Sequence, residues 1–554
     1  MPTSSACGGN TDACSARNTN FRIDPNSLAP PRAFPDKSPP VSPILARIKA
    51  LLRDPHTREF FAWCLPALLV GLALRVLLTI HAPWAYFHDD APDFLATPDR
   101  LLNGFEFSIH VKKTFLVPIV FTIPFLLHLP ALIVIPLFQH ALGLALVVLI
   151  GLLCRLWFRA WRLFIVPLTL LTAVNPFFLW YEHTLMAETI YIVCTVLVAV
   201  AGTLYALRQS RGRFILLCTA LFLEAGARPE GKLLFGFGLF LLALLHWRAW
   251  RENIVRFAVM FALAVGTHFA TKTSQAGLLL YTSVARLTPT ELKCAPGFDP
   301  YIAPVREDLQ RRWEERPQFP RVRDRRAVAD AVERYMEDRD MKGTRHSDVN
   351  AFCLKLATET CRRNFSTLPV HTWHKFRFVA NEAPSGRLDN AWLFDKQREA
   401  YLDALPRNSR LARNLFGREM QTPAEMNAWI DTHYGEVPWL NTLIDRWLAV
   451  VNAWRFPDAQ YPNEQWPAVP IVYPGVPFYF LVAAAGLIAV ALRRGTLQPF
   501  HVAWCLTMLA FFYTIMLTAN VRPRFRFVFE PFWFLYIALL AESLWLCIRR
   551  GSRR

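Results

Sequence analysis

Long apolar runs, separated by short segments rich in arginine, constrain this chain more than any other feature of its sequence. The hydrocarbon core of a bilayer is about 30 Å thick, so a helix needs roughly 20 apolar residues to cross it. Of the 554 residues, 53% are hydrophobic and only 19% are charged. Since a spanning helix satisfies its own backbone hydrogen bonds, the sequence predicts an all-α polytopic membrane protein.

Ten membrane spans are predicted from these runs. They cover about residues 60–81, 131–154, 163–181, 184–207, 214–227, 232–247, 254–272, 470–492, 500–519 and 527–548. Residues 114–130 are also apolar, but three prolines interrupt them, which disfavours a straight spanning helix and favours an interfacial segment. An eleventh span there would invert the orientation of every later segment.

Arginine clusters orient these spans, because basic residues are enriched in the short cytoplasmic loops of membrane proteins. One side receives the groups Arg155, Arg159 and Arg162; Arg208, Arg211 and Arg213; Arg248, Arg251 and Arg256; Arg493 and Arg494; and the basic C-terminal tail. We expect both termini in the cytoplasm, with the bacterial inner (plasma) membrane as the location. The net charge of +18 follows largely from such arginines, so no nucleic-acid partner is expected.

Composition divides the chain into four parts. Residues 1–50 begin with a stretch rich in Pro, Ser, Asn and Thr, which predicts a disordered cytoplasmic tail. Residues 51–272 form an N-terminal transmembrane module that contains the candidate chemistry. Residues 273–469 are polar, with helical patterns, and predict a mostly helical extracytoplasmic region. Residues 470–554 form a C-terminal transmembrane module.

An acidic cluster follows the first apolar run directly. It contains His88, Asp89, Asp90 and Asp93. A carboxylate at the centre of a membrane helix costs about 2.5 to 3.5 kcal/mol on insertion scales, so membrane proteins keep such groups mainly where function uses them. Two interpretations remain open: the acids line a site, or they belong to a solvated loop.

Three arginines, Arg522, Arg524 and Arg526, break the orientation rule, because they lie on the non-cytoplasmic end of two adjacent spans. A guanidinium group binds phosphate through paired donors and keeps its charge at physiological pH. The cluster therefore suits a lipid-linked phosphate. The alternative is that these side chains only reach lipid headgroups.

Charged residues also mark two other positions on the predicted outer side. Arg228, Glu230 and Lys232 lie in a turn shaped by proline and glycine, where they form either a binding site or a local ion pair that closes the hairpin. Glu188 is flanked by apolar residues near the end of its span, and a lone acid in such a setting usually faces the bundle interior. Its role is either functional or structural.

The order of these patterns resembles the GT-C superfamily of integral-membrane glycosyltransferases, which use polyprenyl-phosphate sugars and include protein O-mannosyltransferases and lipid A aminoarabinose transferases. The matching patterns are Asp89-Asp90 with Phe94 and Ala96, Phe138-Gln139-His140, Ala187-Glu188, Arg228-Pro229-Glu230-Gly231, and Arg524-Phe525-Arg526. The resemblance covers about residues 60–272 and 500–548. Phe525 stands where the family usually has tyrosine.

The resemblance implies that a sugar moves, with inversion, from a polyprenyl-phosphate donor to a lipid, glycan or protein acceptor outside the cytoplasm. Asp89 would be the general base, and Asp90 would orient the acceptor or tune this base. Substrate-binding roles are implied for the hydrogen-bonding residue His88, for the phosphate-clamping cations Arg228, Lys232, Arg522, Arg524 and Arg526, and for the acids Glu188 and Glu230. No cofactor is required, although Asp89, Asp90 and Glu188 leave room for a divalent metal.

Two other classes of protein would also use buried acids and basic groups. A transporter or flippase for a lipid-linked anion should show internal repeats, and no duplication between the two halves is visible. A non-catalytic scaffold of the same fold would tolerate replacement of its acids.

Overall fold

A computed structural model describes most of residues 53–551. The undescribed stretches within this range are 87–90, 105–113, 271–275, 289–290, 316–321, 342–345, 374–421, most of 423–436, 452–475, 493–494 and 519–527. The chain divides into two units, Met1–Arg58 and Glu59–Arg554. In the first, Asp54 accepts a hydrogen bond from the backbone N–H of Thr57 (2.9 Å) and so caps the start of the first described helix.

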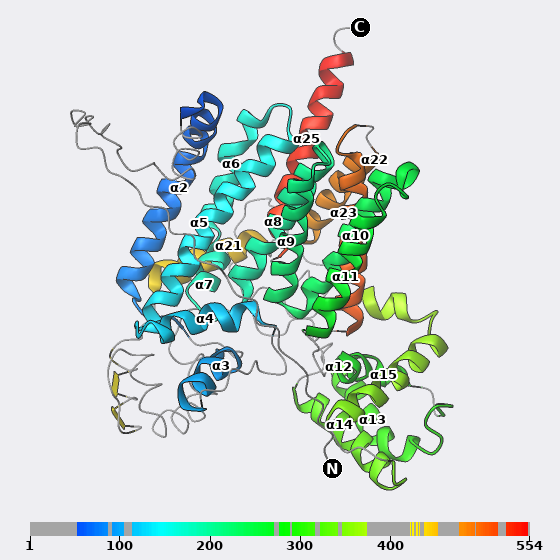
Figure 1. Ribbon diagram of the computed structural model, residues 1–554. Helices are drawn as coiled ribbons and strands as arrows, with labels where there is room; N and C mark the ends of the chain where they lie inside the picture. Colours follow the sequence, from blue (N-terminus) through cyan, green and yellow to red (C-terminus); the bar gives the residue numbers. More distant parts are fainter. Residues whose placement is uncertain are drawn as a thin grey trace, which may run out of the picture. The chain divides into compact units, whose positions relative to one another are not determined.

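The described residues are helical and contain no strand; their one isolated β-bridge joins Tyr86 to Thr184. In chain order the elements are α2 (Pro55–His81), α3 (Ala91–Gly104), α4 (Leu116–Leu126), α5 (Ala131–Trp157), α6 (Trp161–Val174), α7 (Pro176–Glu182), α8 (Glu188–Leu207), α9 (Arg211–Ala227), η1 (Pro229–Leu233), α10 (Leu234–His246), η2 (Trp247–Ala249), α11 (Ile254–Ala270), α12 (Ala276–Val284), η3 (Ala285–Leu287), α13 (Asp299–Glu315), α14 (Val322–Glu337), α15 (His346–Arg363), α21 (Pro438–Val451), α22 (Val476–Leu492), α23 (Gln498–Thr518) and α25 (Glu530–Gly551) (Figure 1).

Five described stretches are long and apolar enough to cross a membrane. They are Pro55–His81, Ala131–Trp157, Glu188–Leu207, Pro229–Ala249 and Glu530–Arg549. A sixth candidate is the pair α6 and α7, which bends by 50°. The all-helical prediction is thus confirmed for the described residues, and the helices are compatible with a membrane protein. The count of about ten spans stays a prediction.

Some predicted spans correspond to helices too short to be candidates by themselves. The helices α9 and α11 have 17 residues each, which at 1.5 Å per residue is about 26 Å, less than the hydrocarbon core. Pro176 begins α7, and the Asn175 side chain accepts the Phe177 N–H (3.0 Å), so a new helix starts where α6 ends. This cap explains the bend.

The segment predicted to be interfacial forms α4, which has 11 residues and contacts α5. Figure 1 shows α4 running across the direction of α5. Pro118 and Pro124 lie within the segment, and a helix of this length reaches only about 17 Å. It cannot cross a bilayer unaided.

The long helices pack against one another with alternating direction. The helix α5 contacts α6 and α8, and α8 contacts α9; short connections join α5 to α6 and α8 to α9. At one end of the bundle, Trp157 donates through Nε1 to Thr203 Oγ1 (2.9 Å), which joins the last turns of α5 and α8. Nearby, the Ala160 N–H donates to Glu542 of α25 (2.7 Å). The opposite ends of these helices meet at the α7–α8 connection and the turn from α9 to η1.

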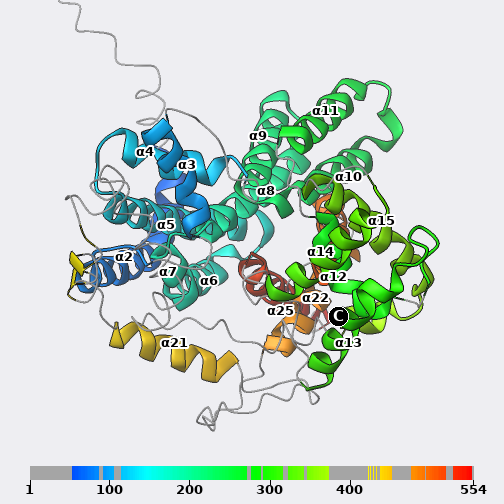
Figure 2. The ribbon, with the colours of Figure 1, turned by 90° about the horizontal axis from the view of Figure 1, so that it is seen from below.

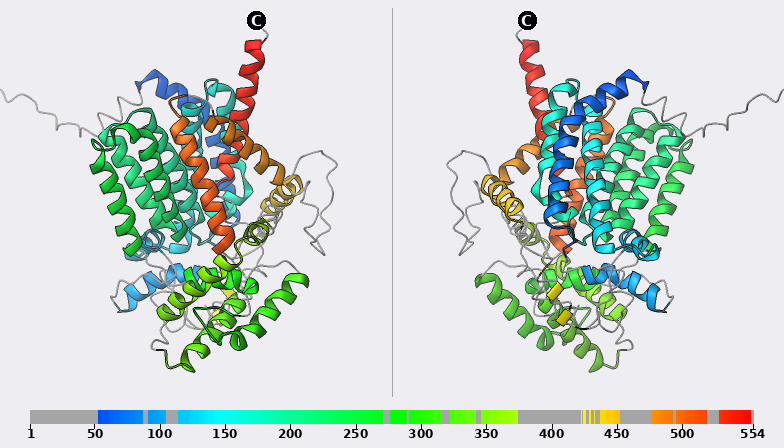
Figure 3. Two further views of the ribbon diagram at one scale, coloured as in Figure 1. Left: turned by 90° about the vertical axis from the view of Figure 1, so that its right-hand side faces the viewer. Right: turned by 90° about the vertical axis from the view of Figure 1, so that its left-hand side faces the viewer.

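The C-terminal helices α22, α23 and α25 lie side by side (Figure 3). The ring of Trp504 meets that of Phe237 from α10 nearly at right angles, with 5.0 Å between ring centroids. Such edge-to-face contacts add to the free energy gained by burying the rings. The C-terminal helices therefore complete the same core as α5, α8 and α10.

A second hydrophobic core lies within α12, α13, α14 and α15, which group together in Figure 2. Its centre is aromatic: the rings of Phe298 and Tyr335 lie 5.1 Å apart, and Tyr281 is fully buried. Asn350 of α15 accepts the Gly277 N–H of α12 (2.8 Å). These contacts make the described start of the polar 273–469 region a small helical bundle.

Candidate functional site

A buried ionic cluster forms where α8 begins and α9 ends. Arg228 donates through Nη1 to Glu188 Oε1 at 2.9 Å, and its Nε lies 3.5 Å from Glu230 Oε2. The guanidinium carbon also lies 5.5 Å from the centroid of the Tyr191 ring, within range for a cation–π contact. We call Glu188, Tyr191, Arg228 and Glu230 the Glu188–Arg228 cluster. It brings together three of the residues that the sequence singled out.

Local sequence explains how the turn that holds Arg228 is formed. The residue is extended (φ −147°, ψ 151°), so it ends α9, and Pro229 then starts the short helix η1. A Cβ atom on Gly231 would lie 2.4 Å from the Glu224 carbonyl oxygen, so only glycine allows the two backbones this approach. The shorter ion pair of Arg228 is with Glu188 of α8 (2.9 Å), and the longer one is with Glu230 of the same turn (3.5 Å).

Glu188 occupies the first turn of α8, where the positive end of the helix dipole favours a carboxylate. Its exposed fraction is 1%, and that of Arg228 is 9%. Lys232, the fourth predicted residue of this region, lies in η1 and is half-buried. The acid and its cation therefore interact away from water, where their attraction is least screened.

A further buried acid, Glu224 of α9, lies one turn before Arg228. Its Oε1 is 2.6 Å from Thr195 Oγ1 of α8, and this hydroxyl is also 3.0 Å from the carbonyl oxygen of Tyr191. A threonine hydroxyl has a single hydrogen to donate. Thr195 is the donor toward both oxygens, so its one hydrogen is shared between the Tyr191 carbonyl and the Glu224 carboxyl. Sequence reasoning did not select Glu224, although its position inside an apolar run is a signal of function in membrane proteins.

The segment that leads to the acidic loop is attached to the start of α8. The Tyr86 N–H donates to the His183 carbonyl (2.9 Å), and the Leu185 N–H donates to the Tyr86 carbonyl (2.9 Å). Asp89 follows Tyr86 by three residues, and Glu188 follows Leu185 by three. The bridge thus joins the two chain segments that lead into the acid pair and into the Glu188–Arg228 cluster.

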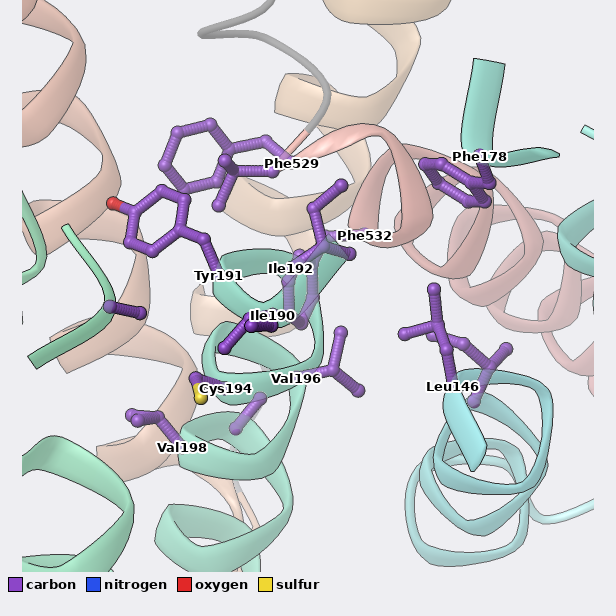
Figure 4. Close-up of a cluster of buried hydrophobic side chains, with 14 of the residues drawn as sticks. Leu146, Phe178, Ile190, Tyr191, Ile192, Cys194, Val196, Val198, Phe529 and Phe532 are labelled. Atoms are coloured by element: carbon purple, nitrogen blue, oxygen red, sulfur yellow. The ribbon is translucent and has the colours of Figure 1, made fainter. Parts of the chain in front are cut away.

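The residues that follow the three arginines are also packed near this cluster. Val528, Phe529 and Phe532 are buried at the start of α25. Figure 4 shows Phe529 and Phe532 grouped with Ile190, Tyr191 and Ile192 of α8. The described residues after the arginine segment therefore contact the first turns of α8.

The predicted residues His88, Asp89 and Asp90, and the arginines Arg522, Arg524 and Arg526, lie outside the described residues. Their roles stay predictions. Among the residues that the structure describes, no group of three or more His, Cys, Asp or Glu side chains could hold a metal ion. A metal site built with Asp89 and Asp90 is likewise outside this range.

A second buried ionic group lies between α2, α5 and α7, and sequence reasoning did not identify it as a site. Arg75 Nη2 lies 2.5 Å from Glu182 Oε1, and His140 Nδ1 lies 2.9 Å from Glu182 Oε2. His140 Nε2 is in turn 3.2 Å from His183 Nδ1. We call Arg75, His140, Glu182 and His183 the Arg75–Glu182 network. A single arginine in the first apolar run was the signal that could have found it.

His183 lies in the connection after α7 and is fully buried. Its burial, together with the neighbouring His140, lowers the pKa of His183 to about 3. The ring is therefore neutral at physiological pH and carries one N–H.

No protein-family model, curated protein or solved structure matches this chain.

Proposed function

We propose that this protein is a membrane glycosyltransferase of the GT-C type, which moves a sugar from a polyprenyl-phosphate donor to an extracytoplasmic acceptor. The observation that carries the proposal is that two of the matching patterns meet: Glu188 of the Ala187-Glu188 pattern pairs with Arg228 of the Arg-Pro-Glu-Gly turn at 2.9 Å. The helical hairpin of α8 and α9 brings these two patterns, which are 40 residues apart in the chain, to the same end of the bundle, as a shared site requires. An acid paired with an arginine beside a membrane suits the handling of a lipid phosphate.

In the proposed reaction, Asp89 takes the proton of the acceptor hydroxyl. The hydroxyl oxygen attacks the anomeric carbon of the sugar from the side opposite the phosphate, so the configuration inverts. The bond between the anomeric carbon and the phosphate oxygen breaks, and the polyprenyl phosphate leaves with the bonding electron pair. Asp90 orients the acceptor or tunes the basicity of Asp89.

Positive charge is needed where the phosphate departs. Arg522, Arg524 and Arg526 supply it in the proposal, together with Arg228 and Lys232. A guanidinium group pairs with two phosphate oxygens at once, which fixes the phosphate in position. Glu188 and Glu230 hold Arg228 from two sides, at 2.9 Å and 3.5 Å, and so limit the directions in which it can donate.

The proposed location is the bacterial inner membrane, with the site outside the cytoplasm and both termini inside. Support comes from the alternation of the long helices. The arginine-rich α5–α6 and α8–α9 connections lie at one end of the bundle, while Tyr86, Glu188 and Arg228 lie at the other. Basic short loops mark the cytoplasmic side. The acceptor is then a lipid, glycan or protein of the cell envelope.

The test is transfer from a panel of radiolabelled polyprenyl-phosphate sugars to membrane acceptors by the purified protein. We expect the wild type to transfer at least one sugar and Asp89→Asn to transfer none while remaining folded. Asp99→Asn, in the same part of the chain, is the matched control and should keep activity. Turnover by Asp89→Asn removes Asp89 from the base role, and no transfer by the wild type overturns the proposal.

One observation favours a second candidate, a transporter or flippase for a lipid-linked anion. The helices α6 and α7 bend by 50° at Asn175-Pro176, and broken spans are frequent in transporters. Movement of a fluorescent polyprenyl phosphate across proteoliposomes, unchanged by Asp89→Asn, would support this candidate. A non-catalytic scaffold would show neither activity.

A further inference from the structure

The Arg75–Glu182 network joins the helices α2, α5 and α7 to the short connection between α7 and α8. Arg75 comes from α2 and His140 from α5, and both bind the side chain of Glu182 at the end of α7. Arg75 is 3% exposed and Glu182 is 1% exposed. The network therefore fixes the last residue of α7 from two directions inside the bundle.

The neighbouring Gln139 of α5 extends this hold to the backbone beyond α7. Its Nε2 donates to the carbonyl of Thr184 at 2.7 Å and to that of Glu182 at 3.2 Å. Thr184 is the bridge partner of Tyr86, which also exchanges backbone hydrogen bonds with His183 and Leu185. A continuous series of contacts thus runs from the bundle interior to Tyr86.

Stability alone is a weak reason for burying an ion pair here. The loss of hydration can exceed the attraction between the charges, and apolar residues of similar volume often stabilise a protein equally well. The close packing is also demanding, because a Cβ atom on Gly143 would lie 1.9 Å from Glu182 Oε1 and 2.7 Å from Arg75 Nη2. Hydrogen bonds and ion pairs are directional, so they fix the orientation of each side chain, which apolar packing does not.

We propose that Gln139 and Glu182 are positioning residues, which act through Thr184 and Tyr86 to fix the chain segment that continues into Asp89 and Asp90. The inference rests on the proposed function and adds the residues that fix the described chain at Tyr86, three positions before Asp89. Gln139 and Glu182 touch no substrate in this proposal. Their effect passes through the Tyr86–Thr184 bridge.

The first test measures hydrogen exchange of the Tyr86 and Leu185 amides in the full-length protein in lipid nanodiscs. Gln139→Met removes the two hydrogen bonds without changing charge, and Glu182→Gln removes the carboxylate. We expect these amides to exchange at least roughly tenfold faster in Gln139→Met, because tenfold is about the factor for one lost buried hydrogen bond and two are removed. The control is Glu542→Gln, which changes a buried acid at the other end of the bundle. Unchanged protection in Gln139→Met overturns the inference.

The second test measures transfer kinetics with the donor identified by the panel. A positioning role predicts that Gln139→Met lowers kcat by at least about tenfold with KM for the donor unchanged, since two buried hydrogen bonds are lost and no donor contact is touched. Wild-type kcat despite faster exchange at Tyr86 overturns the positioning role. Absence of transfer by the wild type counts against the proposed function alone, because the exchange measurement still decides whether Gln139 holds the segment.

Discussion

The guanidinium of Arg228 and the carboxylate of Glu188 form a buried ion pair at 2.9 Å, although 40 residues separate them in the chain. Glu188 begins α8 and Arg228 ends α9, two helices that pack against each other along their lengths. The pair closes the end of this helical hairpin that lies near Tyr86. This pair differs energetically from an exposed pair, because both side chains are almost entirely shielded from water.

Arg228→Met should destabilise the protein by about 3 to 5 kcal/mol, because it leaves the Glu188 carboxylate buried without its cation. Arg162→Met is the control: its pair with Glu59 is close (2.5 Å) but exposed, and such pairs contribute at most about 1 kcal/mol. Thermal unfolding in nanodiscs measures both. Equal effects of the two changes would mean that Glu188 is hydrated in the protein.

Gly143→Ala should disrupt the Arg75–Glu182 network. The added methyl group would lie 1.9 Å from Glu182 Oε1, so the side chains must separate, at a cost of about 1 to 3 kcal/mol. Gly236→Ala in α10 is the matched control, since nothing lies within 4 Å of its added methyl group. That change should stabilise the helix by roughly 0.5 to 1 kcal/mol. A shift of the same sign at both positions, measured by thermal unfolding, would contradict the packing around Gly143.

Glu224 should carry a proton at neutral pH, because its carboxyl is fully buried and the one hydroxyl hydrogen that Thr195 offers it is shared with the Tyr191 carbonyl, which leaves a carboxylate poorly compensated. Infrared spectroscopy should therefore show a carboxylic-acid carbonyl band that Glu224→Gln removes. Glu252→Gln, at an exposed position, should instead reduce the bands of ionised carboxylates. If the spectrum of the wild type minus that of Glu224→Gln contains only bands of ionised carboxylates, Glu224 is ionised and the prediction is wrong.

The helix α15 should lose stability in acid through Glu359. Burial by itself raises the pKa of this carboxyl, but hydrogen bonds from Cys294 and from the Lys293 N–H, with the Arg363 guanidinium, lower it to about 2. A carboxyl whose pKa is lowered on folding stabilises the folded state above its ordinary value of 4.5, and this contribution disappears as the pH falls toward 2. Stability should therefore fall within this window.

Hydrogen exchange of α15 amides in Glu359→Gln and in the wild type measures this effect at matched pH. The variant should be less protected at pH 7, and its protection should approach that of the wild type as the pH falls to and below about 2, the pKa of Glu359 in the folded protein. Glu337→Gln, on the exposed side of α14, should match the wild type throughout. If the variant is still equally less protected than the wild type near pH 2, the effect of Glu359→Gln comes from altered packing and not from the lost charge.

Arg524→Ala should weaken binding of a polyprenyl-phosphate donor in nanodiscs, because the cluster of three arginines loses a paired donor to phosphate. Arg549→Ala is the control, a basic residue beside the other end of α25. Unchanged donor affinity of Arg524→Ala would leave the three arginines as contacts to lipid headgroups.

Several sequence predictions concerned single segments, and these were the easiest to make. The position of Glu188 inside an apolar run indicated that it faces other helices, and it is buried. The Pro229 and Gly231 pattern predicted the turn that presents Arg228. The span count was harder, because the bend at Pro176 divides an apolar run that looks continuous in the sequence.

The sequence did not predict which buried charged residues contact each other, since a one-dimensional pattern contains no information about which helices meet. Arg75 and Glu182 lie 107 positions apart, and nothing in either segment indicates the other. In the sequence Gly143 is an ordinary small residue of a predicted span; only the structure shows that a larger side chain there would collide with Glu182. The bridge between Tyr86 and Thr184 has no signal in the sequence either, because one pair of residues forms no period.

The helical character of the chain and its apolar segments were readable from the residues alone, because the length and polarity of each segment are local properties that hydration acts on directly. The sequence also showed which charged residues interrupt the apolar segments. How these charges are compensated became visible in the folded chain, where Arg228 pairs with Glu188 and Arg75 with Glu182. Compensation of a buried charge depends on distance in space, and the packing of the helices sets that distance.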